Sequence, residues 1–199
     1  MPTPDFQPRM GTGYFVAAMV RILENQGLAS GLADLISKSA DSVGQGLEEI
    51  EGKGEELAGK IAGKIPVVYA NEKFARLAMV WKIKFNEHAK NPAFWNFFPE
   101  LNHNEMVGFT NQGERFFLVM LKDPEDNLRN LKRYDVMAQV VREKGLEAAM
   151  LTLEGANAFE RIFKSLLLAD FCAYYLAYHN KVDPTPVEMV EAFKRQLKS

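Results

Sequence analysis

The stretch from Asn91 to Phe109, NPAFWNFFPELNHNEMVGF, combines residue types that seldom occur together unless they line a site. Its aromatic side chains and prolines favour packing, whereas His103, its flanking asparagines and Glu105 need polar partners. A surface loop has no need for so many large apolar groups, and a core element would not tolerate these polar ones unpaired. Apolar packing that fixes a few polar groups is typical of a ligand pocket. We therefore expect this segment to form the wall of a site.

Two side chains in or just before this segment are candidates for proton transfer. Glu87 ends an expected helix, on the flank of its apolar face, where a carboxylate can serve as a general base. A histidine side chain titrates close to neutral pH, which suits His103 for proton exchange with a substrate. Glu105 is a rival acid or base, and Glu100 a weaker one. Because a glutamate at a helix end is usually a solvated surface group and a lone histidine is usually structural, the residues alone leave these assignments open.

The remaining polar candidates have ordinary interpretations when each is taken alone. Arg9 follows Gln7-Pro8 near the N-terminus, and Lys194 lies in a C-terminal amphipathic segment. Basic residues near chain ends and helix ends are common. His88 and His179 follow helical segments without a partner pattern, so we interpret them as structural. Cys172 lies in the apolar run LLLADFCAYYLAY, which predicts a buried and unreactive thiol.

Short apolar runs alternate with longer amphipathic segments along most of the chain. The runs at 65–69, 115–122 and 146–153 are typical of buried parallel strands. Helices are expected from Asn71 to about Glu87, over 126–144, after Gly155 as far as Tyr178, and over 187–197 after a break at 183–186. Strands separated by helices imply right-handed crossovers and a parallel sheet covered on both faces. The pattern predicts an α/β fold of three layers with additional C-terminal helices.

The first third of the chain has a different character. Residues 1–13 have the character of a linker-like N-terminal segment, and apolar residues recur at helical spacing over 14–26. Residues 28–64 keep a helical period but are rich in glycine, which favours interrupted rather than continuous helices. No internal repeat is visible. We interpret residues 1–199 as a single domain with a divergent helical segment at 28–64.

Composition argues against several classes of protein. The 24 basic and 26 acidic residues give a formal net charge of −2, which leaves no basic excess for nucleic acid. The single cysteine cannot form an internal disulfide or a zinc cluster, which fits a reducing cytosol. No segment approaches the roughly 20 apolar residues that span a bilayer, and the N-terminus lacks a signal-peptide pattern. We expect a soluble, cytoplasmic protein.

Three blocks of sequence resemble the bifunctional phosphoglucose/phosphomannose isomerases, which are built from sugar-isomerase (SIS) domains. The blocks are DFQPRMGTGY, IPVVYANEKFARLAMVWKIKFNEHAKNPAFWNFFPELNHNEMVGF, and LLLADFCAYYLAYHNKVDPTPVEMVEAFKRQL. The resemblance covers nearly the whole chain, and the central block is the most specific, whereas residues 28–64 fit poorly. It implies a C-terminal SIS half, because the chain begins a few residues before QPR. The upstream half, which holds the glycine-rich turn and the Ser/Thr cluster that clamp the substrate phosphate, is then absent.

The resemblance also implies a role for each candidate residue. The family's base moves a proton between sugar C1 and C2 through a cis-enediol, and Glu87 in FNEHAK matches it, although the family usually has asparagine where this chain has His88. His103 in LNHNE matches a histidine that the neighbouring subunit contributes to ring opening. Lys194, with Lys198 as the fallback, matches the ring-opening lysine. The arginine of QPR, Arg9, steadies the enediolate. No metal or cofactor is required.

The resemblance further suggests which substrates fit. Glucose-only isomerases carry a glutamine near the start of the last helix, and the corresponding stretch here, from Thr185 to Val187, has none. A smaller side chain leaves room for either C2 epimer, so glucose 6-phosphate and mannose 6-phosphate should both be converted to fructose 6-phosphate. This implies carbohydrate metabolism, in glycolysis or gluconeogenesis, by a homodimer. The alternatives are a non-catalytic sugar-phosphate-binding or dimerisation module and, less favoured, a nucleotide-binding α/β domain.

Overall fold

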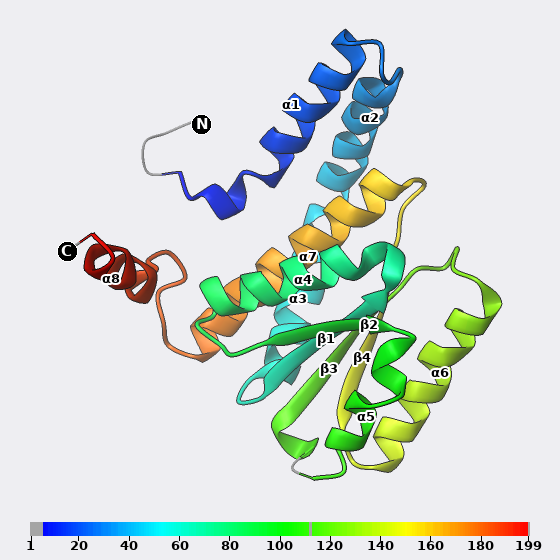
Figure 1. Cartoon of the computed structure of the whole chain (residues 1–199), viewed down its shortest axis with the longest axis vertical. Coiled ribbons are helices and arrows are strands. Elements are labelled where there is room, and N and C mark those ends of the chain that lie inside the picture. The colour runs from blue at the N-terminus through cyan, green and yellow to red at the C-terminus, as the bar shows by residue number, and fades with distance from the viewer. Residues whose placement is uncertain (1–5, 112, 199) are drawn as a thin grey trace.

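A four-stranded parallel sheet forms the centre of the molecule (Figure 1). The computed structural model describes residues 6–111 and 113–198. The strands, in the spatial order β2-β1-β3-β4, are β1 (Ile65–Asn71), β2 (Phe94–Phe98), β3 (Phe116–Lys122) and β4 (Glu147–Thr152). All three neighbouring pairs run parallel. The predicted α/β fold with a parallel sheet is therefore confirmed.

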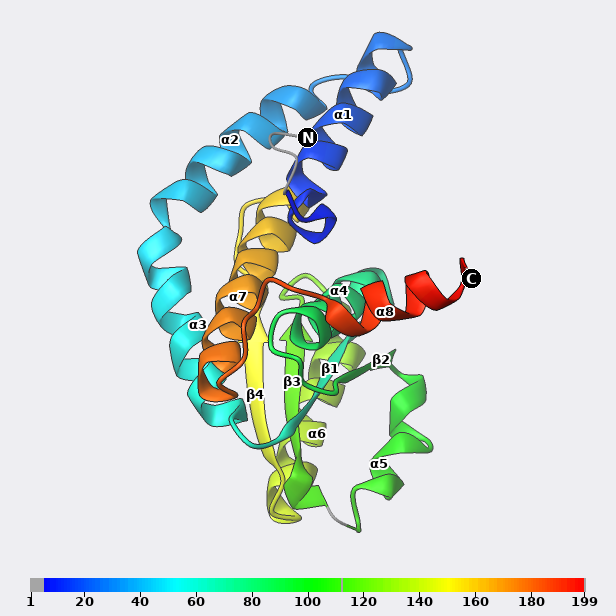
Figure 2. The same ribbon diagram turned by 90° about the vertical axis from the view of Figure 1, so that its left-hand side faces the viewer.

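Helices cover both faces of this sheet, as Figures 1 and 2 show. The long helices are α1 (Thr12–Asn25), α2 (Leu32–Gln45), α3 (Leu47–Ile61), α4 (Ala75–Glu87), α6 (Leu128–Glu143), α7 (Ala158–His179) and α8 (Glu188–Gln196). Short helical turns are η1 (Pro8–Met10), η2 (Glu72–Phe74), η3 (Glu100–Asn102), α5 (Glu105–Gly108) and η4 (Gly113–Arg115). Helices α3, α4 and α7 lie on one face, and α5 and α6 lie on the other. This gives the three layers that the sequence predicts.

The strands place alternate side chains in two separate cores. On β1, Val68 and Ala70 face α3, α4 and α7, whereas Val67 and Tyr69 face α6. This is the two-residue period of a strand that is buried on both sides. Cys172 of α7 lies in the first core, and burial raises the pKa of its thiol, as expected for an unreactive cysteine.

The structure adds detail to three local expectations from the sequence. Residues 94–98, within the segment interpreted as a site wall, form the edge strand β2, so the sheet has a fourth strand. Residues 28–64 contain two long helices, α2 and α3, with a single break at Gly46. Of the expected linker-like segment 1–13, residues 1–5 lie outside the described residues, and the described part contains η1 from Pro8 and the start of α1 at Thr12.

Helices α1 and α2 extend beyond the sheet-containing body, and α8 lies to one side of it (Figures 1 and 2). Hydrogen bonds tie α2 to the start of α7: the Ser42 hydroxyl donates to Glu160 over 2.5 Å, and the Asn157 amide donates to Ser39 over 3.1 Å. Helix α1 is joined to α2 by the Ala33 backbone N–H, which donates to Oε1 of Glu24 over 3.0 Å. Val20 is the one buried residue of α1, and α8 has no buried residue. In the described part of the chain, no helix is long and apolar enough to cross a membrane.

Candidate active site

Glu87 and Arg9 meet at the amino-terminal end of the sheet. Glu87 is the last residue of α4, the helix that leads back from β1 to the start of β2. Its Oε2 lies 3.6 Å from Nη1 of Arg9. The Arg9 side chain is only 10% exposed, whereas that of Glu87 is 38% exposed. A carboxylate that a buried cation orients, and that solvent and small molecules can still reach, is suited to proton transfer.

Arg9 is held by two further segments of the chain. Its Nη1 donates to Oε1 of Gln7 over 2.9 Å, and its Nη2 donates to the carbonyl oxygens of Pro184 and Thr185 over 3.2 and 2.6 Å. The guanidinium thus joins the N-terminal segment, the end of α4 and the loop before α8. The Arg9 Nε is buried and finds no hydrogen-bond partner among the described residues.

A buried polar cluster lies beneath Glu87. Lys84, one turn earlier on α4, forms an ion pair with Asp170 of α7, and both side chains are largely buried. Nδ1 of His88 lies 3.8 Å from the same Asp170 oxygen. Burial, together with the nearby charges of Lys84, Arg9 and Lys90, lowers the pKa of His88 to about 4. His88 is therefore neutral at physiological pH, in keeping with its interpretation as a structural residue.

Lys90 belongs to this site but was not identified from the sequence. Its backbone is left-handed, with φ of 52°, and its Nζ donates to the Glu87 carbonyl and, over 3.3 Å, to the Pro184 carbonyl. Burial and the nearby Arg9 charge lower its pKa. The bond to the last turn of α4 satisfies one of the free carbonyls that every helix end leaves. The only sequence signal was a lysine three residues after the candidate base.

His103 lies at the opposite end of the sheet from Glu87. It follows η3, beyond the carboxyl end of β2, and is exposed. Strand β2 leads from the Glu87 side to the His103 side, and five residues of strand span about 17 Å. One chain therefore does not bring the two residues together.

The rival carboxylates near His103 already have partners. Tyr69 donates its hydroxyl to Glu105 over 2.5 Å, and the amide of Asn96 donates to the other carboxylate oxygen. Burial and the neighbouring Glu105 raise the pKa of Tyr69. Glu100 accepts a bond from Asn104 over 3.3 Å at the surface. Glu105 thus holds α5 against the sheet. Of the three candidates Glu100, His103 and Glu105, His103 is the one for which no side-chain hydrogen bond is described.

The C-terminal candidates divide into two groups. Thr185 is brought to Arg9 through its carbonyl, and Val187, the residue before α8, lines a hollow of about 760 Å³ together with Gln7 and Thr185. Lys194 is exposed on α8, where its Nζ pairs with Glu191 at 2.7 Å, and no contact joins it to Glu87 within the described chain. Lys198 is also exposed.

Charged side chains form ion pairs beyond the carboxyl ends of β1 and β3. In parallel α/β sheets, ligands favour the carboxyl ends of strands at the point where the strand order reverses. Here Asp123, the buried residue after β3, pairs with Lys73 at 3.0 Å and Arg161 at 3.4 Å. A nucleotide phosphate would meet this carboxylate, so the nucleotide-binding interpretation gains no support.

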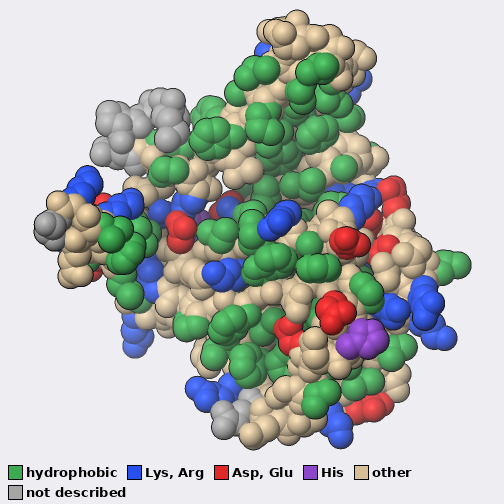
Figure 3. All heavy atoms as spheres, viewed as in Figure 1, with side chains coloured by type: hydrophobic (Ala, Val, Ile, Leu, Met, Phe, Trp, Pro, Cys, Tyr) green, Lys and Arg blue, Asp and Glu red, His purple; other side chains and the backbone are tan. Residues whose placement is uncertain are grey.

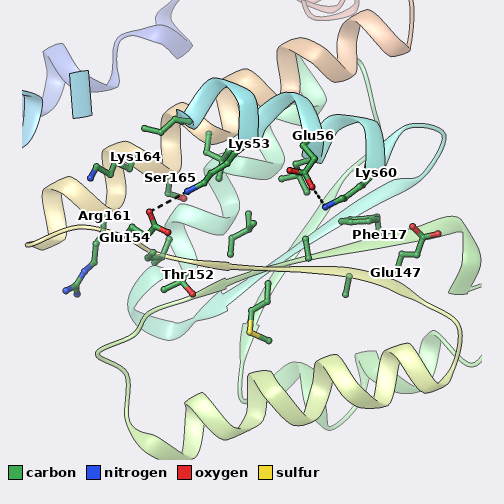
Figure 4. Close-up of a pocket in the computed structure, with 18 of the residues that line it drawn as sticks. Lys53, Glu56, Lys60, Phe117, Glu147, Thr152, Glu154, Arg161, Lys164 and Ser165 are labelled. Atoms are coloured by element: carbon green, nitrogen blue, oxygen red, sulfur yellow. Dashed lines mark hydrogen bonds and ion pairs between the residues drawn. The ribbon is translucent and has the colours of Figure 1, made fainter. Parts of the chain in front are cut away.

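A hollow of about 810 Å³ lies along β4 beneath α3 and α7. Figure 4 shows its rim, where Lys53 pairs with Glu154 and Lys60 with Glu56. None of the candidate residues lines it. Across residues 6–111 and 113–198, no group of three or more His, Cys, Asp or Glu side chains is arranged to hold a metal ion.

Comparisons with known proteins identify the family to which the chain belongs. Residues 50–197 match the family model described as the bacterial phospho-glucose isomerase C-terminal SIS domain. A bifunctional phosphoglucose/phosphomannose isomerase of Aquifex aeolicus is 32% identical over 97% of this chain and 59% of its own length. One of Caldicellulosiruptor bescii is 30% identical over 96% of this chain and 60% of its own length. The chain thus spans about 60% of the length of these two relatives.

A solved structure agrees at the level of the fold. A glucose-6-phosphate isomerase-like protein from Thermus thermophilus superposes with a TM-score of 0.62 at 20% identity. The match covers 79% of this chain and 56% of that one. The predicted family and the predicted SIS-type fold are both confirmed.

Replacing His88 by asparagine should make the protein less sensitive to acid. The imidazole binds a proton near pH 6.5 when unfolded but only near 4 in the fold, so its contribution to stability is present above pH 6.5 and is lost as the pH falls toward 4. The fall in Tm between pH 7 and pH 4.5 should therefore be smaller in His88→Asn than in the wild type. His179→Asn, at an exposed site, is the control and should match the wild type. Equal falls in all three proteins would contradict the buried neutral imidazole.

Proposed function

The chain belongs to the family of bacterial phosphoglucose isomerase C-terminal SIS domains, and from this membership we propose that it is the C-terminal half of an aldose–ketose isomerase. Its substrates would be glucose 6-phosphate and mannose 6-phosphate, each interconverted with fructose 6-phosphate. The curated relatives carry names that state this dual activity. The reaction would place the protein in cytoplasmic carbohydrate metabolism.

The observation that carries the proposal is the contact between Arg9 and Glu87. Glu87 takes the proton from C2 of the open-chain aldose and returns it to C1, through a cis-enediol. Removing that proton puts negative charge on the adjacent oxygen, and a buried guanidinium 3.6 Å from the base is well situated to stabilise it. Proton transfer of this kind uses neither a metal nor a cofactor.

Ring opening needs further groups, which come from beyond this site. His103 lies at the far end of β2, so we propose that a second copy of the chain supplies it and that the active form is a two-fold homodimer. Lys194 of α8 is the second ring-opening group, with Lys198 as the fallback. Both lysines are exposed, and α8 has no buried residue. In the active assembly, α8 must therefore take a position that brings Lys194 to the substrate.

The substrate phosphate requires a partner as well. The relatives are longer than this chain by about 40% of their own length, and we propose that an upstream SIS half carries the phosphate clamp. The alternative is a sugar-phosphate-binding or dimerisation module that keeps the fold without turnover. Fructose 6-phosphate formation from glucose 6-phosphate, assayed with the chain alone and with the upstream half, separates the two. Turnover in either assay supports the enzyme, and absence of turnover in both favours the module.

Glu87→Gln should abolish most activity while leaving the fold intact. The amide keeps the size of the side chain but cannot accept the substrate proton, so kcat should fall by about 10²–10⁴-fold with little change in KM. Glu55→Gln, on the exposed face of α3, is the matched control and should retain full activity. A Glu87→Gln protein with near wild-type kcat would exclude Glu87 as the base.

Mixing two inactive variants should restore activity if His103 acts across the dimer. A hybrid of Glu87→Gln and His103→Ala chains has one doubly damaged site and one intact site. With random reassociation, half of the dimers are hybrids, so about a quarter of wild-type activity should return. Each variant mixed with itself is the control. Absence of recovery, after mass spectrometry has confirmed that hybrids formed, would mean that His103 serves the Glu87 of its own chain or neither.

Enlarging the side chain at position 187 should narrow the choice of substrate. We propose that Val187 and Thr185 bound the C2 side of the sugar, since both line the hollow beside Gln7. Val187→Gln should lower mannose 6-phosphate turnover more than glucose 6-phosphate turnover. A steric effect of this kind is worth about 1–3 kcal/mol, so the change should be graded. Kinetics on both substrates measure it, and equal loss on both would show that this position does not discriminate at C2.

A further inference from the structure

Helix α1 is apolar on all sides but is almost uncovered. Its sequence is TGYFVAAMVRILEN, and Val20 is its one buried residue. Tyr14, Phe15 and Ile22 are 62%, 56% and 61% exposed. Other large apolar side chains exposed on or beside the helix are Met10, Met19, Leu23 and Leu28. A helix that is hydrophobic all round is normally buried. In the described part of the chain, most of the apolar surface of α1 has no protein packed against it.

The chemistry of α1 indicates a protein partner. Arg21 and Glu24 are its two charged residues, and they lie 3.9 Å apart on the same helix, so α1 carries no net charge. A helix that binds anionic lipid would instead show a basic face. Small residues such as Gly13 and the alanines allow another element to approach closely. The surface therefore suits an apolar protein face.

The position of α1 limits what that partner can be. Figures 1 and 2 show α1 beyond the sheet, with α2 as its neighbour, and Figure 3 shows apolar side chains gathered over this projecting region. The helix begins two residues after η1, which contains Arg9. At its base, a hollow of about 460 Å³ between α1, α2 and α7 is lined by apolar residues, with Arg9, Lys84 and Asp170 at its polar end. Whatever covers α1 therefore lies next to the Glu87 site.

The lengths of the chain and its relatives point to one occupant. The C-terminal SIS family model begins at residue 50, so all of α1 and α2 lies upstream of that domain. The curated relatives that the chain matches are longer, with about 40% of their length unmatched. Because the matched family is a C-terminal domain, the unmatched part belongs upstream of it.

We propose that α1 is the docking element for the upstream SIS half, and that this half buries Tyr14, Phe15 and Ile22 in its own apolar core. This inference rests on the proposed function and extends it, because the same contact holds the phosphate-clamping half beside Arg9 and Glu87. A second copy is a poorer occupant. In Figure 1, α1 and α5 lie at opposite ends of the molecule, and His103 directly precedes α5, so pairing through α1 leaves His103 far from either Glu87.

Hydrogen exchange read by mass spectrometry tests the proposal on two proteins. In the chain alone, at low and high concentration, amides of α1 should exchange at least about tenfold faster than those of α7. In a fusion that adds the unmatched upstream part of the Aquifex aeolicus relative before Gln7, exchange of α1 should slow by about a hundredfold. Ile22→Asp in the fusion should remove that protection, whereas the control Lys38→Asp, at an exposed position on α2, should not.

Two results would overturn the docking role. One is slow exchange of α1 amides in the chain alone. Slow exchange in the monomer would mean that α1 needs no partner, and slow exchange in a dimer that Ile22→Asp dissociates would mean that a second copy covers α1. The other is a folded fusion in which α1 still exchanges rapidly. If the fusion does not fold, the exchange of α1 compared with α7 in the chain alone still tests whether α1 is uncovered. Turnover of glucose 6-phosphate by the fusion is measured separately. Protection of α1 without turnover supports docking and contradicts the proposed function. Turnover without protection of α1 supports the proposed function and contradicts docking.

Discussion

The candidate site depends on the contacts that the guanidinium of Arg9 makes with three segments of the chain. The guanidinium contacts Glu87 at the end of α4 and the carbonyls of Pro184 and Thr185, residues more than 170 positions away from Arg9 in the sequence. A buried guanidinium with several acceptors in fixed directions restricts all of them at once. The N-terminal segment, the base and the loop before α8 therefore keep their relative positions only while this cation is in place. Lys90 strengthens the same junction by bonding Glu87 and Pro184 carbonyls.

Much of the fold could be predicted because its elements follow simple periods. The strands β1, β3 and β4 follow the apolar runs of the sequence, and Asn71 marks the start of a helix as expected. Gly54 of α3 misled the prediction because it serves tertiary packing. At Gly54, an added Cβ would lie 2.6 Å from Phe171 Cβ, so glycine lets α3 and α7 pack closely. This packing outweighs a helix-propensity cost of about 1 kcal/mol.

Strand β2 and the site illustrate why the remaining features were harder to predict. The residues of β2 mix aromatic and polar types because the strand lies at the sheet edge, where Phe98 is buried and Phe94 is exposed. Arg9, Glu87 and His103 were assigned by family resemblance, since no spacing in the sequence reveals that α4 ends beside residue 9. The roles of Lys84, Asp170 and Lys90 depend on contacts between α4, α7 and the loop before α8. Such contacts between distant segments leave no local pattern.

The central claim is that Glu87, oriented by Arg9, moves a proton between adjacent sugar carbons. The most direct measurement is the conversion of glucose 6-phosphate in D₂O by the chain assembled with its upstream half, followed by nuclear magnetic resonance over many turnovers. Because a carboxylate base exchanges its proton with solvent, the account predicts deuterium at C1 of fructose 6-phosphate and conversion by Glu87→Gln that is at least about a hundredfold slower. Conversion without deuterium in the product, or with Glu87→Gln as active as the wild type, would contradict it.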